Sequence, residues 1–186
     1  ATESRRVTAR SIAPDAQITD SLEDVLRNDQ IQGIALATPA ETHAELAVQA
    51  MQAGKDVFVE KPMALTLEDA EKMKSVAEET NRILMVGHLL EYHPAVLKLV
   101  EMIASGELGK INYIYSNRLN FGKIRTEENA LWSFAPHDVA VILRLMGKAP
   151  VEVSASGGSY LTNGIADTTM SNMRFENESR AHIFVS

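Results

Sequence analysis

The sequence contains no cysteine, and this absence removes several chemistries at once. Without thiols the chain can form no disulfide framework, no thiolate metal site and no cysteine nucleophile. Long hydrophobic runs are also missing, since no apolar stretch approaches the roughly 18 residues that a membrane helix needs. We therefore expect no membrane partner and a cytoplasmic location, where thiols would stay reduced in any case.

Basic residues are scarce relative to acidic ones. The chain carries 18 Lys and Arg against 25 Asp and Glu, which gives a net charge of −7 at pH 7. Nucleic-acid binding rewards clustered positive charge, so we expect no nucleic-acid partner. The overall composition, with 45% apolar and 23% charged residues, is typical of a folded globular chain. The composition therefore argues against a disordered or fibrous protein.

Three short apolar runs stand out in the first half, at residues 33–37, 57–59 and 83–86. Uninterrupted apolar character is typical of strands that helices cover on both faces. Between the runs, apolar residues recur at spacings of three and four over 41–53 and 67–80, which predicts two helices. Thr66 is the expected N-cap of the second helix, and Ser21 that of a shorter helix before the first run. Strands that alternate with helices predict a doubly wound parallel sheet.

The pattern changes beyond residue 88. His93-Pro94 is expected to open a helix that Gly106 ends, and the alternation over 111–116 favours an antiparallel strand. A further helix is predicted from about Pro136 to Met146. We expect a second, α+β domain with a largely antiparallel sheet. Its other predicted strands lie at residues 151–160, 167–176 and 180–186, and the predicted domains span 1–108 and 109–186.

Polar residues follow each of the three apolar runs. In an open parallel sheet ligands bind at the carboxyl ends of the strands, so these residues are the candidates for a binding site. Two of them have ordinary alternatives: Thr38 as a helix cap, and Lys61 as a solvated lysine. Against the second alternative, Pro62 constrains the backbone next to Lys61 and Glu60 offers a partner. The candidates are Thr38-Pro39 with His43, Glu60-Lys61-Pro62, and Gly87-His88.

His137 is the candidate residue of the second domain. A histidine at the start of a helix is often structural, but the helix dipole disfavours its protonated form, and a neutral imidazole can accept a proton. His88, Glu91 and His93 suggest a metal site at first sight. Pro94 places them across a bend, and no HExxH or Cys partner exists, so we expect no metal.

These residues resemble the signatures of the Gfo/Idh/MocA family of NAD(P)-dependent oxidoreductases. Thr38-Pro39-Ala40-Glu41-Thr42-His43 is similar to the family's Thr/Asn-Pro-x-x-x-His segment, and Glu60-Lys61-Pro62 to its Glu-Lys-Pro signature. His137 lies ten residues before Gly147, as the catalytic histidine of the family does before a helix-ending glycine. The resemblance implies that the first domain is a Rossmann-like dinucleotide-binding domain.

The resemblance also implies roles for single residues. His137 and Lys61 would be catalytic, while Thr38, Pro39, His43, Glu60, Lys61 and Pro62 would line the cofactor. His88 and Arg125 would contact the substrate together with Lys61 and His137. The segment 125–138 is most similar to the branch that acts on nucleotide sugars, such as UDP-N-acetylglucosamine 3-dehydrogenases of surface-polysaccharide synthesis.

The chain departs from the family pattern in two ways. Many members carry Asp four residues before the catalytic histidine, where this chain has Ser133. The family's Gly-x-Gly-x-x-Gly turn, which holds the cofactor pyrophosphate, is also absent. By the resemblance, 1–108 lacks an N-terminal portion of its domain and 109–186 a C-terminal portion of its own. We expect this chain alone to bind NAD weakly.

The implied function is transfer of a hydride from a sugar carbinol carbon, C3 of a UDP-N-acetyl-hexosamine or its uronate, to a nicotinamide. NAD is favoured over NADP, although the discriminating residue is not among those of the chain. Two alternatives remain: a dehydrogenase of a free sugar or inositol, and a non-catalytic binding remnant of the same fold. The resemblance further implies a homo-oligomer, a dimer or tetramer formed through the second-domain sheet, when the protein is complete.

Overall fold

The computed structural model describes residues 2–119, 124 and 128–186. The chain divides into two compact units, Ala1–Gly87 and His88–Ser186. Helix α5 (Pro94–Ala104), which the sequence analysis assigned to the first domain, packs against α6 (Ala130–Met146) and so belongs to the second unit. In the described part of the chain, no helix is long and apolar enough to cross a membrane.

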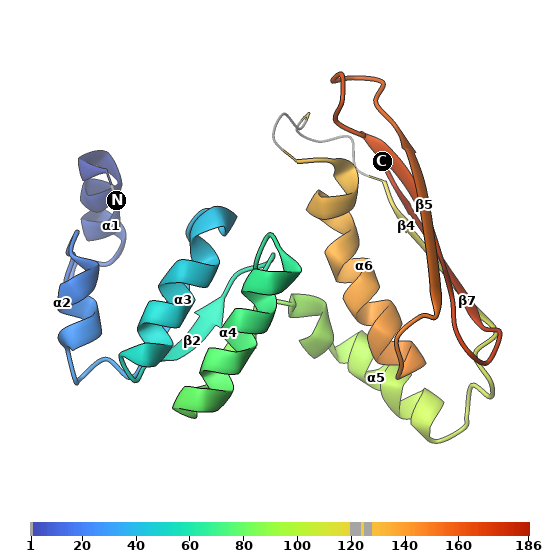
Figure 1. The fold of residues 1–186 in the computed structure, drawn as a ribbon, viewed down its shortest axis with the longest axis horizontal. Helices are drawn as coiled ribbons and strands as arrows, with labels where there is room; N and C mark the ends of the chain where they lie inside the picture. Colours follow the sequence, from blue (N-terminus) through green and yellow to red (C-terminus); the bar gives the residue numbers. More distant parts are fainter. Residues whose placement is uncertain (1, 120–123, 125–127) are drawn as a thin grey trace. The chain divides into compact units, whose positions relative to one another are not determined.

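The first unit is built on a parallel sheet of three strands in the order β1-β2-β3. Helix α3 (His43–Gln52) connects the first two strands and α4 (Leu67–Thr80) connects the last two, as Figure 1 shows. The predicted parallel sheet is therefore confirmed. The strands are β1 (Gly33–Leu36), β2 (Asp56–Val59) and β3 (Leu84–Val86).

Both helices pack on the same face of this sheet. Val57 and Val59 of β2 are fully buried against Met51 of α3 and Met73 of α4. Each such side chain contributes on the order of 1.5–3 kcal/mol when it leaves water. The apolar runs predicted cover on both faces, but side chains of the opposite face, such as Met85, remain exposed. In the described part of the chain, the predicted cover by helices is therefore present on one face of the sheet.

Local capping explains where the helices begin and end. The Ser21 hydroxyl accepts a hydrogen bond from the Asp24 N–H at 3.1 Å and starts α2 (Leu22–Arg27). The Thr66 hydroxyl does the same for the Asp69 N–H at the start of α4, also at 3.1 Å. Both caps were predicted. Helix α1 (Glu3–Ile12) was not, because it buries no residue and shows no clear apolar stripe.

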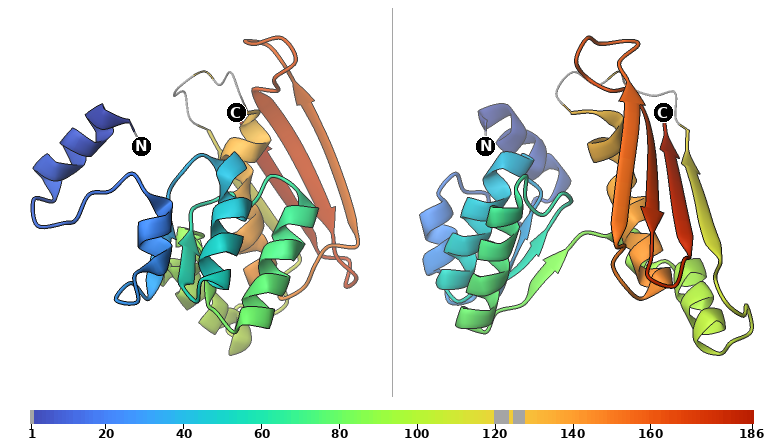
Figure 2. Two further views of the ribbon diagram at one scale, coloured as in Figure 1. Left: turned by 60° about the vertical axis from the view of Figure 1, so that its left-hand side comes forward. Right: turned by 45° about the vertical axis from the view of Figure 1, so that its right-hand side comes forward.

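The second unit contains a four-stranded sheet in the order β4-β7-β6-β5. The hairpins β5-β6 and β6-β7 are antiparallel, as predicted, but β4 pairs with β7 in parallel (Figure 2). The antiparallel prediction for β4 is therefore wrong. Alternation of apolar and polar residues indicates that one face of a strand meets solvent, but it does not indicate the direction of the strand. The long connection from β4 to β7, which carries α6, allows the two strands to pair in parallel. The strands are β4 (Tyr113–Arg118), β5 (Glu152–Gly158), β6 (Thr168–Arg174) and β7 (Arg180–Val185).

Helix α6 covers one face of the second sheet. Ile142 of the helix, Phe175, and Ile183 of β7 are almost completely buried in this core. The helix begins at Ala130, where the Asn129 side chain accepts a hydrogen bond from the Trp132 N–H at 3.0 Å. The predicted start at Pro136 is therefore wrong. Proline favours a first helical turn but also occurs inside helices that tertiary packing holds.

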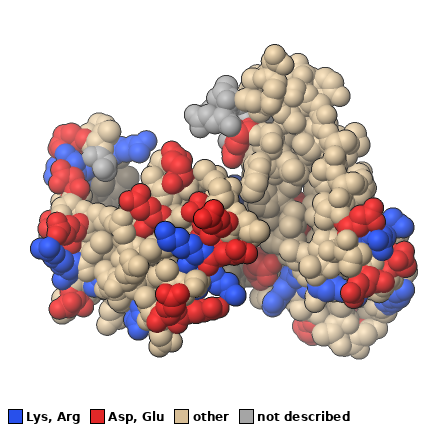
Figure 3. All heavy atoms as spheres, in the orientation of Figure 1, with Lys and Arg blue, Asp and Glu red and all other residues tan. Residues whose placement is uncertain are grey.

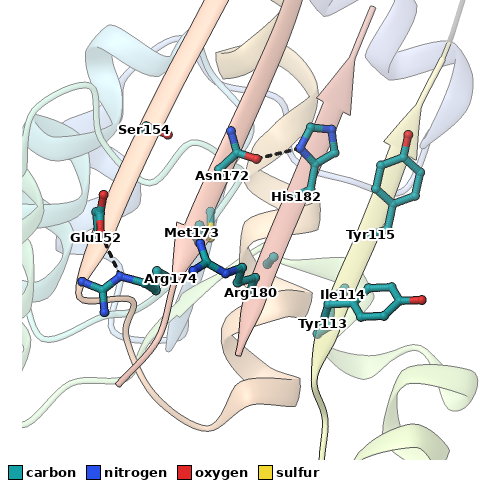
Figure 4. A pocket seen from close by; sticks show the side chains of 11 residues that line it. Tyr113, Ile114, Tyr115, Glu152, Ser154, Asn172, Met173, Arg174, Arg180 and His182 are labelled. Atoms are coloured by element: carbon teal, nitrogen blue, oxygen red, sulfur yellow. Dashed lines mark hydrogen bonds and ion pairs between the residues drawn. The ribbon is translucent and has the colours of Figure 1, made fainter. Parts of the chain in front are cut away.

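The opposite face of this sheet is open and carries a hollow of about 500 Å³ (Figure 4). Tyr115 and His182 stack there with ring centroids 5.1 Å apart, and a His182 ring nitrogen lies 2.9 Å from the Asn172 side-chain oxygen. A hydrogen bond from Arg174 to Glu152 raises the pKa of Arg174 above its ordinary value. An oligomer through this sheet stays a prediction.

Charge of both signs is mixed over the visible surface. Figure 3 shows Lys and Arg interspersed with Asp and Glu on the face that it presents, without a continuous basic area. Exposed ion pairs occur among the described residues, such as the Lys74–Glu78 pair one turn apart on α4. Exposed pairs of this kind contribute little to stability.

Candidate functional site

The candidate site begins at the carboxyl edge of the first sheet. Thr38 follows β1, Glu60 follows β2 and Gly87 follows β3. Because all three strands are parallel, the three residues lie along one edge. The structure therefore brings together the predicted residues of the first unit.

Glu60 lies across the end of β3. A Cβ atom at buried Gly87 would come within 3.1 Å of a Glu60 carboxylate oxygen, so a larger residue there would displace the side chain. The same oxygen accepts a hydrogen bond from the Lys61 backbone N–H at 3.2 Å. The Lys61-Pro62 peptide is cis. Lys61 is half-buried, with its backbone N–H bound by Glu60 and the fixed ring of Pro62 directly after it.

His43 connects two of the strand-end loops. It is 1% exposed. One ring nitrogen lies 2.8 Å from the carbonyl oxygen of Pro62 and the other 2.9 Å from that of Thr38. The histidine at the start of α3 thus ties the loop after β1 to the loop after β2. Sequence reasoning placed His43 at the cofactor and missed this connection, for which the sequence carries no signal.

Thr38 and Pro39 remain exposed at the edge. The Thr42 hydroxyl hydrogen-bonds to the Thr38 hydroxyl and to the Pro39 carbonyl, both at 2.8 Å. Helix α3 starts at His43, and Thr38 does not cap it. The capping alternative for Thr38 is therefore wrong, and its side chain is available at the candidate site.

His137 lies in the second unit, in the middle of α6 and not at its start. The argument from the helix dipole does not apply to it, because that effect falls off within the first turn. Ser133 is buried one turn earlier on the same helix. The neighbouring Asp138 is buried too and binds Ser116 and Arg118 of β4. Sequence reasoning missed Asp138, because one of its two partners, Arg118, lies beyond the strand predicted over 111–116.

The other two predicted substrate-binding residues are His88 and Arg125. His88 opens the second unit, directly before a short 3-10 turn (Leu89–Tyr92), and its buried Nδ1 has no hydrogen-bond partner among the described residues. Arg125 lies outside the described residues. Within the described ranges, no group of three His, Asp or Glu side chains is arranged to hold a metal ion.

Comparison with known proteins decides the family. The model of the oxidoreductase family with an NAD-binding Rossmann fold, GFO_IDH_MocA, matches residues 2–88. The model of the GFO/IDH/MocA C-terminal domain matches residues 96–186. The chain belongs to the Gfo/Idh/MocA family. The Rossmann-like identity of the first domain and the class of the fold are thereby confirmed.

The relatives of this Gfo/Idh/MocA chain carry varied names. An uncharacterized oxidoreductase of Streptococcus pneumoniae is 29% identical over 88% of this chain and 48% of its own length. A UDP-N-acetylglucosamine 3-dehydrogenase of Acidithiobacillus ferrooxidans is 30% identical, over 84% of this chain and 49% of its own length. Two scyllo-inositol 2-dehydrogenases of Bacillus subtilis, one named for NAD(+) and one for NADP(+), also match. The chain spans about half the length of the curated relatives it matches.

A solved structure confirms the arrangement of the elements. The NAD-binding protein from Listeria innocua matches 98% of this chain and 54% of its own with a TM-score of 0.88, at 26% identity. The two chains thus share a fold across both units.

The residues present fit one part of a nicotinamide dinucleotide. Exposed Thr38, half-buried Lys61 and buried Gly87 leave a polar edge at the carboxyl ends of three parallel strands. A dinucleotide binds along such an edge in sheets of this kind. The pyrophosphate calls for a glycine-rich turn, which this Gfo/Idh/MocA chain does not contain. Thr38, Glu60 and Lys61 would be the residues of this edge that hold the rest of the cofactor.

Proposed function

We propose that the protein is a dehydrogenase that oxidises C3 of a UDP-N-acetyl-hexosamine or its uronate, with NAD as the favoured cofactor. The observation that carries the proposal is the strand-end edge of Thr38, Glu60 and Lys61 in a chain that matches the NAD-binding family model. The nucleotide sugar is supported by the relative from Acidithiobacillus ferrooxidans and by the similarity of residues 125–138 to that branch.

Two residues would carry the chemistry. His137 would accept the proton of the sugar hydroxyl at a ring nitrogen as general base. The Lys61 ammonium would stabilise the oxygen as negative charge develops on it and the C=O bond forms. The bound nicotinamide supplies the acceptor for the hydride that leaves the carbon. Glu60 and Pro62 would position Lys61, and His43 would hold the loops on which Thr38 and Pro62 lie.

Two alternatives have support of their own. The scyllo-inositol relatives favour a free polyol as substrate, in which case Arg125 would have no diphosphate to bind. Ser133, at the position where many family members carry Asp, favours a binding protein without turnover. Relatives named for NAD(+) and for NADP(+) leave both cofactors open, and we favour NAD.

Turnover on nucleotide sugars and on the corresponding free sugars and polyols distinguishes the nucleotide-sugar dehydrogenase from the two alternatives. The complete protein should reduce NAD with UDP-N-acetylglucosamine or its uronate at a kcat/KM at least about 100-fold above that for N-acetylglucosamine or scyllo-inositol. The diphosphate contributes charge-assisted contacts that a free sugar lacks, and each is worth roughly 1.5–3 kcal/mol. NADH absorbance at 340 nm follows the reaction. Equal turnover on free polyols would contradict the nucleotide-sugar assignment, and no turnover on any of them would favour the binding protein.

A further inference from the structure

We infer that Asp138 is a positioning residue for His137, acting through its attachment of α6 to strand β4. This inference rests on the proposed function, in which His137 is the general base. It assigns a role to a buried carboxylate that takes no part in the proposed proton or hydride transfer. It also supplies a structural support for His137 in a chain that carries Ser133 where many family members carry Asp.

The carboxylate of Asp138 is 8% exposed and accepts three hydrogen bonds. The Ser116 hydroxyl donates at 2.6 Å, and the Arg118 guanidinium donates from Nε at 2.7 Å and from Nη2 at 3.3 Å. The guanidinium thus engages both carboxylate oxygens side-on, which fixes direction as well as distance. A buried carboxylate with this set of donors is held in one orientation.

The donors come from one face of one strand. Ile114, Ser116 and Arg118 occupy alternate positions of β4, so they point toward the face that α6 covers. Ile114 packs in the core, while the next two positions reach the Asp138 carboxylate. The link therefore joins the middle of α6 to the far end of β4, beside the apolar core that α6 and the sheet share.

A proline weakens the backbone of α6 at the turn that carries His137. Pro136 lies inside α6, where it has no N–H to offer the carbonyl of Trp132 and its ring crowds that carbonyl. His137 follows this proline directly and precedes Asp138. Successive residues of a helix are rotated by about 100°, so an anchored Asp138 sets the direction in which the His137 side chain leaves the helix.

The first test compares variants of the complete protein. Asp138→Asn keeps the size of the side chain but puts an NH₂ group against the Ser116 and Arg118 donors. We expect kcat to fall by about 10- to 100-fold, because small misplacements of a catalytic group have effects of this size, with KM within about twofold. The matched control is Arg144→Gln, which removes the ion pair between Arg144 of the same helix and Glu91 of the 3-10 turn Leu89–Tyr92 and should leave kcat within about twofold.

A double variant separates positioning from general damage to the fold. In the His137→Ala background, Asp138→Asn should change the residual rate by less than about twofold, since the group that it positions is gone. A further 10-fold loss there would show a merely structural role and overturn the inference. If Asp138→Asn does not fold, Ser116→Ala removes one hydrogen bond and keeps the Arg118 pair; it should show the same pattern, with a loss of about threefold.

A measurement without turnover uses NMR spectra of the complete protein. In ¹H–¹³C spectra the ring signal of His137 should shift or broaden in Asp138→Asn, while those of His93 and His182 should stay in place. An unchanged His137 signal would overturn the inference. Loss of kcat in His137→Ala together with wild-type kcat in Asp138→Asn would overturn this inference alone, whereas wild-type kcat in His137→Ala would overturn the proposed function.

Discussion

Replacing His137 by alanine in the complete protein is expected to lower kcat by about 10²- to 10⁴-fold, the usual contribution of a positioned general base. The variant loses the group that accepts the hydroxyl proton, so the alcohol must ionise without help before or during hydride transfer. The dissociation constant for NAD should stay within about twofold, because His137 lies on α6 in the second unit and outside the NAD-binding domain. Steady-state NADH formation and calorimetric titration with NAD measure the two quantities.

The matched control is His93→Ala, which replaces an exposed histidine at the start of α5. It should leave kcat within about twofold. Added imidazole should restore part of the rate of His137→Ala, since a free base can occupy the space that the side chain leaves. Turnover of His137→Ala at the wild-type rate would remove His137 from the mechanism.

Replacing Lys61 by methionine is expected to lower kcat by about 10²- to 10³-fold, the loss typical when one preorganised electrostatic contact to a developing oxyanion is removed. Methionine keeps most of the length of the side chain and removes the charge. Because the Lys61 backbone N–H is bound by the Glu60 carboxylate and Pro62 restricts the backbone that follows, the ammonium is expected to be placed before the substrate arrives. kcat and KM for the nucleotide sugar, together with the free energy of unfolding, measure the effect.

The control for Lys61→Met is Lys72→Met, at an exposed position of α4. It should leave kcat unchanged and the free energy of unfolding within about 0.5 kcal/mol. Rescue of Lys61→Met by a mobile amine such as ethylammonium would support the electrostatic role. A wild-type kcat with a raised KM alone would instead show that Lys61 binds the substrate without stabilising the transition state.

Local signals predicted the first unit well. The Ser21 and Thr66 caps begin α2 and α4 where expected, because a cap is decided by residues three positions apart. The apolar runs predicted β1, β2 and β3, and parallel pairing then placed Thr38, Glu60 and Gly87 at one edge. Sequence was sufficient here because the edge of a parallel sheet follows from strand direction alone.

Long-range contacts decided the features that sequence reasoning missed. The parallel pairing of β4 depends on which neighbour it meets, and α6 runs through Pro136 because its apolar face is buried on the sheet. His43 bonds to Pro62, 19 residues away, and Asp138 to Ser116, 22 residues away. No local spacing encodes such a pair, so the support of a site is harder to predict than its location.

The fate of the hydrogen at C3 tests the central claim most directly. The complete protein, supplied with NAD and a UDP-N-acetylglucosamine that carries deuterium at C3, should form singly deuterated NADH and a 3-keto sugar in equal amounts, as mass spectrometry of both products would show. Substrate deuterated at C4 should give unlabelled NADH. Unlabelled NADH from the C3-deuterated substrate, or reduction of NAD only with free polyols, would contradict the account.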